Sequence, residues 1–320
     1  MIVDAKVDAA ISALPRELNK RNIMEFTAAT KRILRTDSGH KMRKDIKVLN
    51  DIRRRNITFM PSDKSRRLIA LSDDRYMSMM DEHKLNLIPT KPSLPSSRQA
   101  SFNRDLSRIA NKYTDPLKTS LLEGLCCEPI PSRMRCLPKD HKTGELRGRP
   151  IVAAIDAPAT KLSIILAKVL HPMIIRSVKS HLFSTSQFMD IVQAVQLEDS
   201  YQFVSFDVVN LYGSIPIEDS LFPGLISIVT DFFFDNKGVT VFSAISRVDF
   251  MKLLRLAVSS DTVDVNNPFF QQKSGIQMGS NVSVACATIF MNFIEKQILE
   301  EAGGAIKLWV RSIDDVFLCI

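Results

Sequence analysis

The last thirteen residues constrain the fold of this chain more than any other segment. Residues 308–320 (LWVRSIDDVFLCI) place two adjacent carboxylates, Asp314 and Asp315, between two short apolar runs. Apolar runs of strand length on both sides of a short polar segment predict two buried strands joined by a tight turn. Carboxylates with buried flanks are costly unless a cation compensates them, and hard divalent cations prefer oxygen ligands. An isolated Asp-Asp pair is more often a solvated turn, so a metal site here requires another acid.

Asp207 is the acid that fits this requirement. It follows residues 201–206 (YQFVSF), whose β-branched and aromatic side chains predict a half-buried strand. Gly213 and Pro216 then end the extended segment. Asp207 alone would be a strand-terminal acid facing solvent. Together with Asp314 it predicts a site for two metal ions, an arrangement that clamps the attacking and leaving oxygens of phosphoryl transfer.

A second pair of acids, Asp73 and Asp74, serves as a comparison within the chain. It follows an apolar run and Ser72, and it precedes a helix-like stretch. Carboxylates are favourable in the first turn of a helix, where serine is a common N-cap. The sequence therefore predicts a helix start at this pair, with no metal.

A polar, glycine-bearing loop lies between Asp207 and the terminal acids. Residues 271–280 (QQKSGIQMGS) lead into residues 281–300, a run long and apolar enough to predict a helix buried on more than one side. Glycine allows close approach of a backbone, and a helix start offers free N–H groups to an anion. Met278-Gly279-Ser280 on its own is an ordinary helix N-cap region.

In this order, the blocks resemble motifs A, B and C of reverse transcriptases, and they are most similar to those of Penelope-like retroelements. The three matching blocks are residues 206–216 (FDVVNLYGSIP), 275–280 (GIQMGS) and 313–317 (IDDVF). Upstream, residues 137–144 (LPKDHKTG) with residues 149–151 (RPI) resemble the fingers motif of the same group, and residues 61–67 (PSDKSRR) are a fainter match. Each block alone is weak, but five in the right order form a strong signal that extends from about residue 60 to the end.

The resemblance implies an RNA-directed DNA polymerase site that works by a two-metal mechanism. Asp207 and Asp314 would hold two Mg²⁺ ions, for which Mn²⁺ can substitute, and Asp315 would be a supporting acid. The carbonyl of Val208 would be a backbone ligand. Tyr212 would be the aromatic residue that excludes a ribose 2′-hydroxyl, although without the resemblance it would be read as a core aromatic.

The resemblance also implies residues that contact the incoming nucleotide. Met278 and Gly279 would lie along the nucleotide and the template base. Four basic residues would neutralise the triphosphate: Arg149, Lys139, Lys142 and Lys64. The planar fork of arginine binds phosphate oxygens bidentately, which suits Arg149 to this role. Without the resemblance, Arg149 fits an exposed strand edge equally well.

The implied fold class is α+β, the fingers and palm of a right-hand polymerase with an antiparallel palm sheet backed by helices. We expect a basic helical region at 1–60, fingers at 61–180, and a palm at 181–320 that is truncated after motif C, with the thumb missing. The patterns predict helices at about 4–35, 40–56, 74–86, 98–123, 158–178, 217–235, 246–259 and after Ser280. They predict strands near 67–71, 133–138, 149–154 and 201–206, and an irregular connection at 89–97.

Some positions depart from the family pattern. Asn281 and Val284 stand where motif B usually has prolines, and Ser312-Ile313 replace an aromatic-valine pair before motif C. These changes leave the carboxylates intact but bear on loop geometry and turnover. The missing thumb and the altered motif B favour an alternative, a catalytically inactive or domesticated nucleic-acid-binding protein. The intact Asp207, Asp314, Asp315 and Tyr212 argue against this alternative. A third interpretation keeps the palm but changes the template, as in telomerase-like or group II intron-like enzymes.

The charge distribution indicates a nucleic-acid partner. Residues 1–150 hold 31 Lys+Arg against 18 Asp+Glu, whereas residues 151–320 hold 12 against 17. A basic front half suits contact with phosphates, although single basic helices are often just solvated faces. The expected partners are an RNA or DNA template with primer and deoxynucleoside triphosphates, with no membrane. Five cysteines without C-x-x-C spacing, and the lack of a signal-peptide pattern, predict an intracellular protein of the nucleus or cytoplasm.

Overall fold

The computed structural model describes only part of the chain. The described residues are 54, 56–65, 67–84, 87–89, 95–127, 130–139, 146–155, 157–195, 201–258, 263–265, 269–272 and 274–320. The helices expected at 4–35 and 40–56 therefore lie outside them, apart from residues 54 and 56. The chain forms two compact units. The first unit combines Met1–Leu85 with Arg135–Ile151, and the second combines Asn86–Met134 with Val152–Ile320.

The first unit contains an antiparallel strand pair followed by a helix. Strand β1 (Ile57–Pro61) pairs with β2 (Leu68–Ser72), and α4 (Asp73–Lys84) begins directly after β2. The backbone N–H of Arg75 donates to Ser72 Oγ at 3.3 Å, which confirms Ser72 as the helix cap. Strands β4 (Ser132–Lys139) and β5 (Arg147–Ala153) confirm two further strands predicted from the sequence, and the residues of each are divided between the units.

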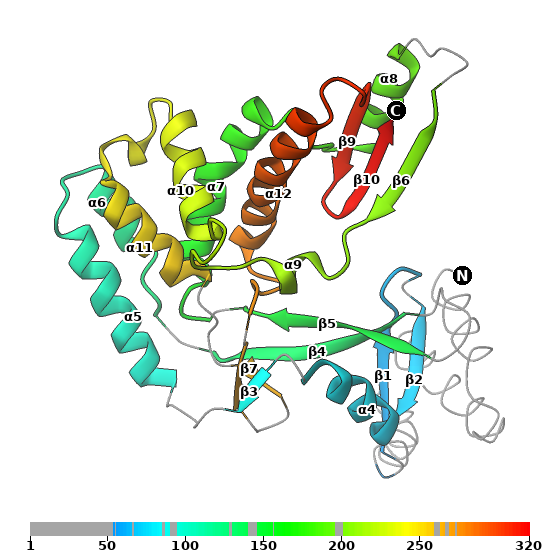
Figure 1. Cartoon of the computed structure of the whole chain (residues 1–320). Helices are drawn as coiled ribbons and strands as arrows, with labels where there is room; N and C mark the ends of the chain where they lie inside the picture. The colour runs from blue at the N-terminus through cyan, green and yellow to red at the C-terminus, as the bar shows by residue number, and fades with distance from the viewer. Residues whose placement is uncertain are drawn as a thin grey trace, which may run out of the picture. The chain divides into compact units, whose positions relative to one another are not determined.

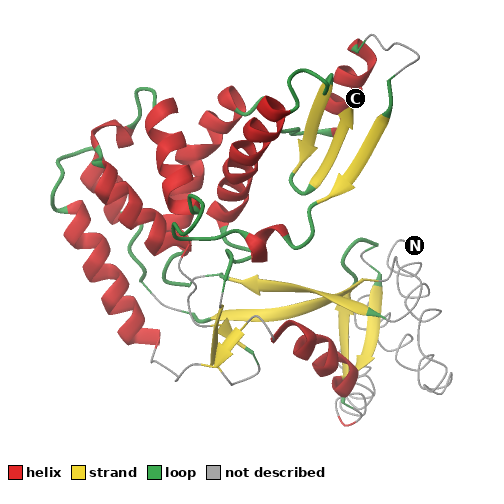
Figure 2. Ribbon diagram, viewed as in Figure 1, coloured by secondary structure: helices red, strands yellow, loops and turns green. Residues whose placement is uncertain are grey.

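The second unit is built on a bundle of helices, seen in Figure 1 and in red in Figure 2. Its helices are α5 (Pro95–Ala110), α6 (Leu117–Leu122), α7 (Thr160–Ser177), α8 (Thr185–Ala194), α9 (Leu211–Ser214), α10 (Leu225–Asn236), α11 (Arg247–Val258) and α12 (Asn281–Glu301), with a 3₁₀ turn at Val241–Ala244. The helices α7, α10 and α11 all pack against α12. Their apolar faces form one continuous core, whose burial is the main source of stability.

Helix α12 is long and apolar enough to cross a membrane by length and composition alone. Among the described residues, it is the only helix with this property. Ten of its residues are buried, and it packs on the neighbouring helices of its own unit. The sequence predicted a helix buried on more than one side, and α12 confirms this prediction. Such burial is typical of a core helix.

Two of the expected helices have the wrong limits. The helix expected at 98–123 is broken between Ala110 and Leu117. Pro116 explains the break, because proline lacks an N–H donor and disfavours helical geometry in the residue before it. The helix expected at 217–235 begins only at Leu225. Before it, the carboxylate of Asp219 accepts a hydrogen bond from the N–H of Gly224 at 2.7 Å and holds residues 219–224 in a loop.

Other elements differ from the expectation or have no counterpart in it. Pro89 ends strand β3 (Leu87–Pro89), and Pro95 opens α5, so the segment expected to be irregular contains the ends of two elements. Proline is well suited to the first turn of a helix. Helix α8 was not expected, yet Ser184 caps it, because its hydroxyl accepts from the N–H of Gln187 at 3.1 Å.

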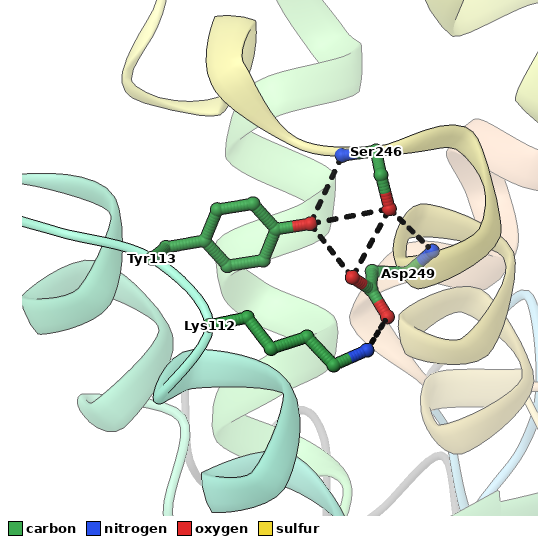
Figure 3. A network of polar contacts seen from close by, with 4 residues as sticks. All are labelled: Lys112, Tyr113, Ser246 and Asp249. Carbon is green, nitrogen blue, oxygen red and sulfur yellow. Dashed lines mark hydrogen bonds and ion pairs between the residues drawn. The ribbon is translucent and has the colours of Figure 1, made fainter.

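A buried carboxylate joins α11 to the segment between α5 and α6 (Figure 3). Asp249 accepts from Lys112 Nζ at 2.6 Å, from Tyr113 Oη at 2.8 Å and from Ser246 Oγ at 3.0 Å. The N–H of Ser246 also donates to Tyr113 Oη at 3.0 Å. Burial raises the pKa of Asp249, but these hydrogen bonds outweigh it and hold the pKa below its ordinary value. The network fixes the start of α11.

Two sheets complete the described fold. One has the strand order β3-β8-β7-β4-β5, where β7 is Val263–Asp264 and β8 is Phe269–Gln272. The other has the order β6-β10-β9, where β6 is Phe203–Asp207, β10 is Asp315–Cys319 and β9 is Leu308–Ser312. All pairs in this second sheet are antiparallel. The expected terminal hairpin is therefore confirmed. The segment before Asp207 does form a strand, but the expectation that it is half-buried is wrong, because β6 is an edge strand of this sheet and all five of its residues are exposed.

Candidate active site

The three acids singled out by the sequence lie together at one end of the sheet β6-β10-β9. Asp207 and Asp315 are register partners across β6 and β10, and the N–H of Val208 donates to the carbonyl of Asp314 at 2.9 Å. This bond marks Asp207 and Asp315 as a non-hydrogen-bonded pair, the kind in which opposite side chains approach most closely. Like charges directly opposite each other destabilise a sheet, so this pair favours a cation between them.

The turn that places Asp314 is strained. Ser312 and Asp315 are register partners, so Ile313 and Asp314 form a two-residue loop. Ile313 has a φ of 59°, a left-handed conformation that β-branched residues rarely adopt. Positive φ at only the first loop residue is typical of a type II′ turn, which usually has glycine there. An isoleucine in this conformation costs roughly 1–3 kcal/mol, so its surroundings must hold it in place.

The acid pair and helix α12 lie on opposite faces of this sheet. Side chains alternate between faces along a strand, so Asp207 and Asp315 share one face while Trp309 and Arg311 point to the other. Trp309 Nε1 donates to Glu295 of α12 at 3.0 Å, which places α12 on the face without the acids. Figure 1 shows α12 running beside β9.

The acid face is partly covered farther along the strands. Phe188 of α8 contacts Phe317 of β10 edge-on, with 5.1 Å between ring centroids, and Phe203 stacks on Phe317 at 5.2 Å. These rings lie on the face of Asp315, two residues or more from it. The end of the sheet that bears the acids is left accessible, since Asp207 and Asp315 are both exposed.

The negative charge of Asp314 acts on the hydroxyl of Tyr212. It belongs to the short helix α9, which Asn210 starts with a left-handed φ of 51°. Burial raises the pKa of the Tyr212 hydroxyl, and the negative charge of Asp314 raises it further. Tyr212 packs partly against the core, so the sequence expectation of a core aromatic is met in part. The side chain is thus a neutral, half-buried ring beside Asp314.

Two glycines fix the loop before α12 against other backbone segments. Gly275 has a φ of 75°, and a Cβ there would lie 2.3 Å from the carbonyl oxygen of Tyr212. Gly279 has a φ of 116°, and a Cβ there would lie 2.3 Å from the carbonyl oxygen of Val152. The N–H of Ile276 donates to the Tyr212 carbonyl at 2.8 Å. The loop therefore rests on the segment after Asp207, which the sequence alone did not reveal.

Met278 is held next to the end of β5. Its carbonyl accepts a hydrogen bond from the N–H of Val152 at 3.1 Å, three residues after Arg149. Met278 is partly buried, and the neighbouring Gln277 is buried. The lack of a side chain at Gly279 therefore allows its backbone to approach Val152 closely. The expected contact of Gly279 with a nucleotide stays a prediction.

The expected triphosphate residues belong to the first unit. Arg149 Nε lies 3.0 Å from Asp63 Oδ2, and the N–H of Asp63 donates to the carbonyl of Pro138 at 2.9 Å. Lys64 directly follows Asp63, and Lys139 directly follows Pro138. The contacts of Asp63 with Arg149 and Pro138 therefore bring the residues next to both lysines close to Arg149. Lys142 lies outside the described residues. Asp63, the ion-pair partner of Arg149, was not expected from the sequence.

The donor set of the acid cluster suits a hard cation. Asp207, Asp314 and Asp315 offer only carboxylate oxygens, which are ligands that Mg²⁺ and Mn²⁺ prefer. The close approach of Asp207 to Asp315 is a repulsion that a cation relieves. In the part of the chain that the structure describes, no three His, Cys, Asp or Glu side chains form a metal-binding group by themselves.

Comparison with known proteins gives matches among solved structures. No protein-family model and no curated protein matches the chain. Telomerase from Candida tropicalis, in complex with a TWJ fragment of telomeric RNA, aligns with a TM-score of 0.57 at 11% identity over 98% of this chain and 53% of that chain. The apo telomerase of Candida tropicalis gives 0.55 at 11% identity over 99% and 55%. Telomerase from Candida albicans, also with a TWJ fragment, gives 0.52 at 12% identity over 99% and 56%.

The chain has a reverse-transcriptase-like fold. The expected α+β class with antiparallel strands agrees with these telomerase structures. At 11–12% identity the likeness concerns the fold alone, and the chain spans little more than half the length of each telomerase chain. Within this reverse-transcriptase-like fold, Asp207, Asp314 and Asp315 lie at one end of the sheet β6-β10-β9, and the charge of Asp314 raises the pKa of Tyr212.

Proposed function

We propose that this chain is the RNA-directed DNA polymerase domain of a Penelope-like retroelement. The observation that supports it most is the pairing of Asp207 with Asp315 across β6 and β10, with Asp314 in the adjoining turn. The reverse-transcriptase-like fold supports the same class of activity. The residues within the motifs support the assignment to a Penelope-like retroelement. In this proposal, residues 61–180 form the fingers and residues 181–320 form the palm.

The reaction is template-directed nucleotidyl transfer. The 3′-hydroxyl of a primer attacks the α-phosphorus of a deoxynucleoside triphosphate, the new phosphodiester bond forms, and pyrophosphate leaves. Asp207, Asp314 and the carbonyl of Val208 would hold two Mg²⁺ ions, with Asp315 as a supporting acid. When bound, two such metal ions activate the primer hydroxyl and stabilise the charge that develops on the reacting phosphate.

Other residues position the nucleotide. Tyr212 lies beside Asp314, where its ring restricts the space next to the sugar and favours deoxyribose over ribose. Arg149 offers a guanidinium fork to the triphosphate, with Lys64, Lys139 and Lys142 as further cations. Arg149 Nε also lies within ion-pair distance of Asp63 Oδ2. Met278 and Gly279 line the nucleotide and template base.

The proposed partners are an RNA or DNA template with its primer. Two of the similar telomerases were solved with telomeric RNA, which supports a nucleic-acid partner for this fold. The excess of basic residues before residue 150 supports the same partner through phosphate contacts. We propose an intracellular location, in which thiols such as the buried Cys286 remain reduced.

Primer extension by an Asp314→Asn variant tests the proposal. We expect the parent to extend a primer on an RNA template with Mg²⁺ or Mn²⁺, and the variant to lose at least about a thousandfold in rate while it keeps template affinity. Asp190→Asn, which neutralises an exposed carboxylate on α8, is the matched control and should extend normally. Equal rates for Asp314→Asn and the parent would refute the assignment.

A catalytically inactive nucleic-acid-binding protein is the second candidate. Asn281 and Val284 at the start of α12, and Ser312-Ile313 in the hairpin, depart from the family motifs. This candidate predicts template binding without Mn²⁺ binding, whereas the polymerase predicts both. Calorimetry with Mn²⁺ alone, followed by the RNA, separates the two.

A further inference from the structure

A buried ion pair joins the hairpin that bears Asp314 to helix α12. Arg311 on β9 and Glu295 on α12 are 0% and 1% exposed, and Arg311 Nε lies 2.5 Å from Glu295 Oε1. Burying two charges is expensive, and a buried ion pair often stabilises a fold no better than apolar residues of the same volume. Its presence between a sheet and a core helix therefore calls for a role beyond packing.

Every nitrogen of the Arg311 guanidinium donates a hydrogen bond, and one of these bonds reaches the hairpin. Nε and Nη2 donate to the two carboxylate oxygens of Glu295, and Nη2 also donates to the carbonyl of Thr288 at 3.3 Å. Nη1 donates to the carbonyl of Ile313 at 2.9 Å. That carbonyl belongs to the residue with positive φ, immediately before Asp314.

Glu295 is itself held from two more directions. Trp309 Nε1 donates to Oε1 at 3.0 Å, and Ser180 Oγ donates to Oε2 at 2.5 Å. The backbone of Arg311 is fixed as well, because its N–H donates to the Ser180 carbonyl and its carbonyl accepts from the N–H of Leu182, both at 2.7 Å. Arg311 is thus anchored at both its backbone and its side chain, so its Nη1 is a fixed donor.

We propose that Arg311, oriented by Glu295, is a positioning residue that holds the strained Ile313 turn and thereby sets the place of Asp314 next to the Asp207–Asp315 pair. The inference deepens the proposed function, since it concerns how the acid site is formed. A strained backbone persists only where its surroundings over-determine it, and the bond from Nη1 to the Ile313 carbonyl supplies that restraint. Neither residue touches the reacting atoms, so neither is a catalytic residue.

The key variant is Arg311→Lys. Lysine keeps a positive charge beside Glu295, but its single ammonium group cannot reproduce the fork that contacts Glu295 and the Ile313 carbonyl together. Ser180→Ala is the matched control, because it removes one hydrogen bond from the same carboxylate and leaves the contact between Arg311 and Ile313 in place.

Hydrogen exchange measures the effect without requiring activity. The amide of Val208 donates to the carbonyl of Asp314, so its protection reports whether the turn stays against β6. We expect Arg311→Lys to lower this protection about tenfold or more relative to Ser180→Ala, after both are corrected for global stability. Equal protection of Val208 in the two variants would overturn the proposal.

A rescue experiment distinguishes a specific loss of the restraint on the Ile313 turn from a general loss of stability. Asparagine tolerates the left-handed conformation much better than isoleucine, so Ile313→Asn relieves the strain that Arg311 opposes. In the Arg311→Lys background, Ile313→Asn should restore most of the Val208 protection and, in primer extension, most of the lost kcat with little change in KM. A double variant no better protected than Arg311→Lys would contradict the positioning role.

The two readouts also separate this inference from the proposed function. If the parent fails to extend a primer but Arg311→Lys still loses Val208 protection, the proposed function fails and the positioning role stands. If the parent is active and Arg311→Lys keeps both its protection and its kcat, the positioning role fails and the proposed function stands.

Discussion

Asp207 and Asp315 lie directly opposite each other in a non-hydrogen-bonded pair of β6 and β10. Two carboxylates at the closest approach that a sheet offers repel each other unless a cation joins them. The chain places this pair at the end of a sheet whose other face packs on α12 through Trp309. The geometry is unfavourable for a purely structural sheet and favourable for a metal site.

The first prediction concerns this repulsion. Replacing Asp315 by asparagine should raise the free energy of unfolding in the presence of a chelator by up to about 1 kcal/mol, because one like charge is removed from the pair. Thermal unfolding in a chelating buffer checks it. Asp190→Asn on α8 should leave the unfolding temperature unchanged. A destabilised Asp315→Asn protein would show that the two carboxylates do not repel each other.

The second prediction concerns the glycines of the loop before α12. Gly275→Ala and Gly279→Ala should each destabilise the protein by about 1–3 kcal/mol or more, because a Cβ would meet backbone oxygens at 2.3 Å and φ is positive. Gly238→Ala is the control, since nothing lies within 4 Å of a Cβ there. Chemical denaturation measures all three. If Gly279→Ala were as stable as Gly238→Ala, the close contact with Val152 would be disproved.

The third prediction concerns the coupling of Tyr212 to Asp314. Because the charge of Asp314 raises the pKa of Tyr212, Asp314→Asn should lower that pKa, while burial still keeps it above its ordinary value. Ultraviolet titration of the tyrosines, compared with a Tyr212→Phe variant, isolates the signal. A Tyr212 pKa unaffected by Asp314→Asn would place the ring away from the acid site.

The fourth prediction concerns His181, which lies beside Arg311. Burial, and then the charge of Arg311, lower its pKa from 6.5 to about 4, with a smaller effect of His171 in the same direction and an opposing effect of Glu295. The unfolded chain therefore takes up a proton at a higher pH than the folded protein does. Stability should fall as the pH drops from about 6.5 towards 4, by at most about 3 kcal/mol from this group.

A His181→Gln variant tests that pH dependence. Its stability should decline less steeply than that of the parent across the same pH window, because the titrating ring is gone. His171→Gln is the comparison, because it removes a second histidine that also contacts Phe183 and leaves His181 in place. Parallel stability curves for parent and His181→Gln would contradict a buried, neutral His181.

Much of the fold could be predicted from local pattern. The terminal hairpin was predictable because short apolar runs flank a polar turn, and α12 because its apolar run is long. The strand at Asp207 was predictable from its β-branched and aromatic residues, but its exposure was not, since these residues also suit a half-buried strand. Helix α8 was missed because its signal is a single capping serine, Ser184. The helix expected at 98–123 was wrong because one proline, Pro116, outweighs the helical pattern on both sides of it.

The candidate site was predictable in its acids but not in its supports. Asp207, Asp314 and Asp315 could be named because carboxylates at strand ends stand out in sequence. Glu295 and Arg311 could not, since an isolated acid within an apolar helix and a basic residue within a strand reveal no partner until the chain is folded. The same holds for Asp63, whose contact with Arg149 joins residues far apart in sequence.

Calorimetry of Mn²⁺ binding to the parent protein and to the Asp207→Asn and Asp314→Asn variants is the direct test of the metal site. We expect saturable binding to the parent, a loss of at least about tenfold in affinity for each variant, and parent-like binding by Asp190→Asn. Absence of Mn²⁺ binding to the parent, or equal affinities across all four proteins, would contradict a metal site formed by Asp207 and Asp314.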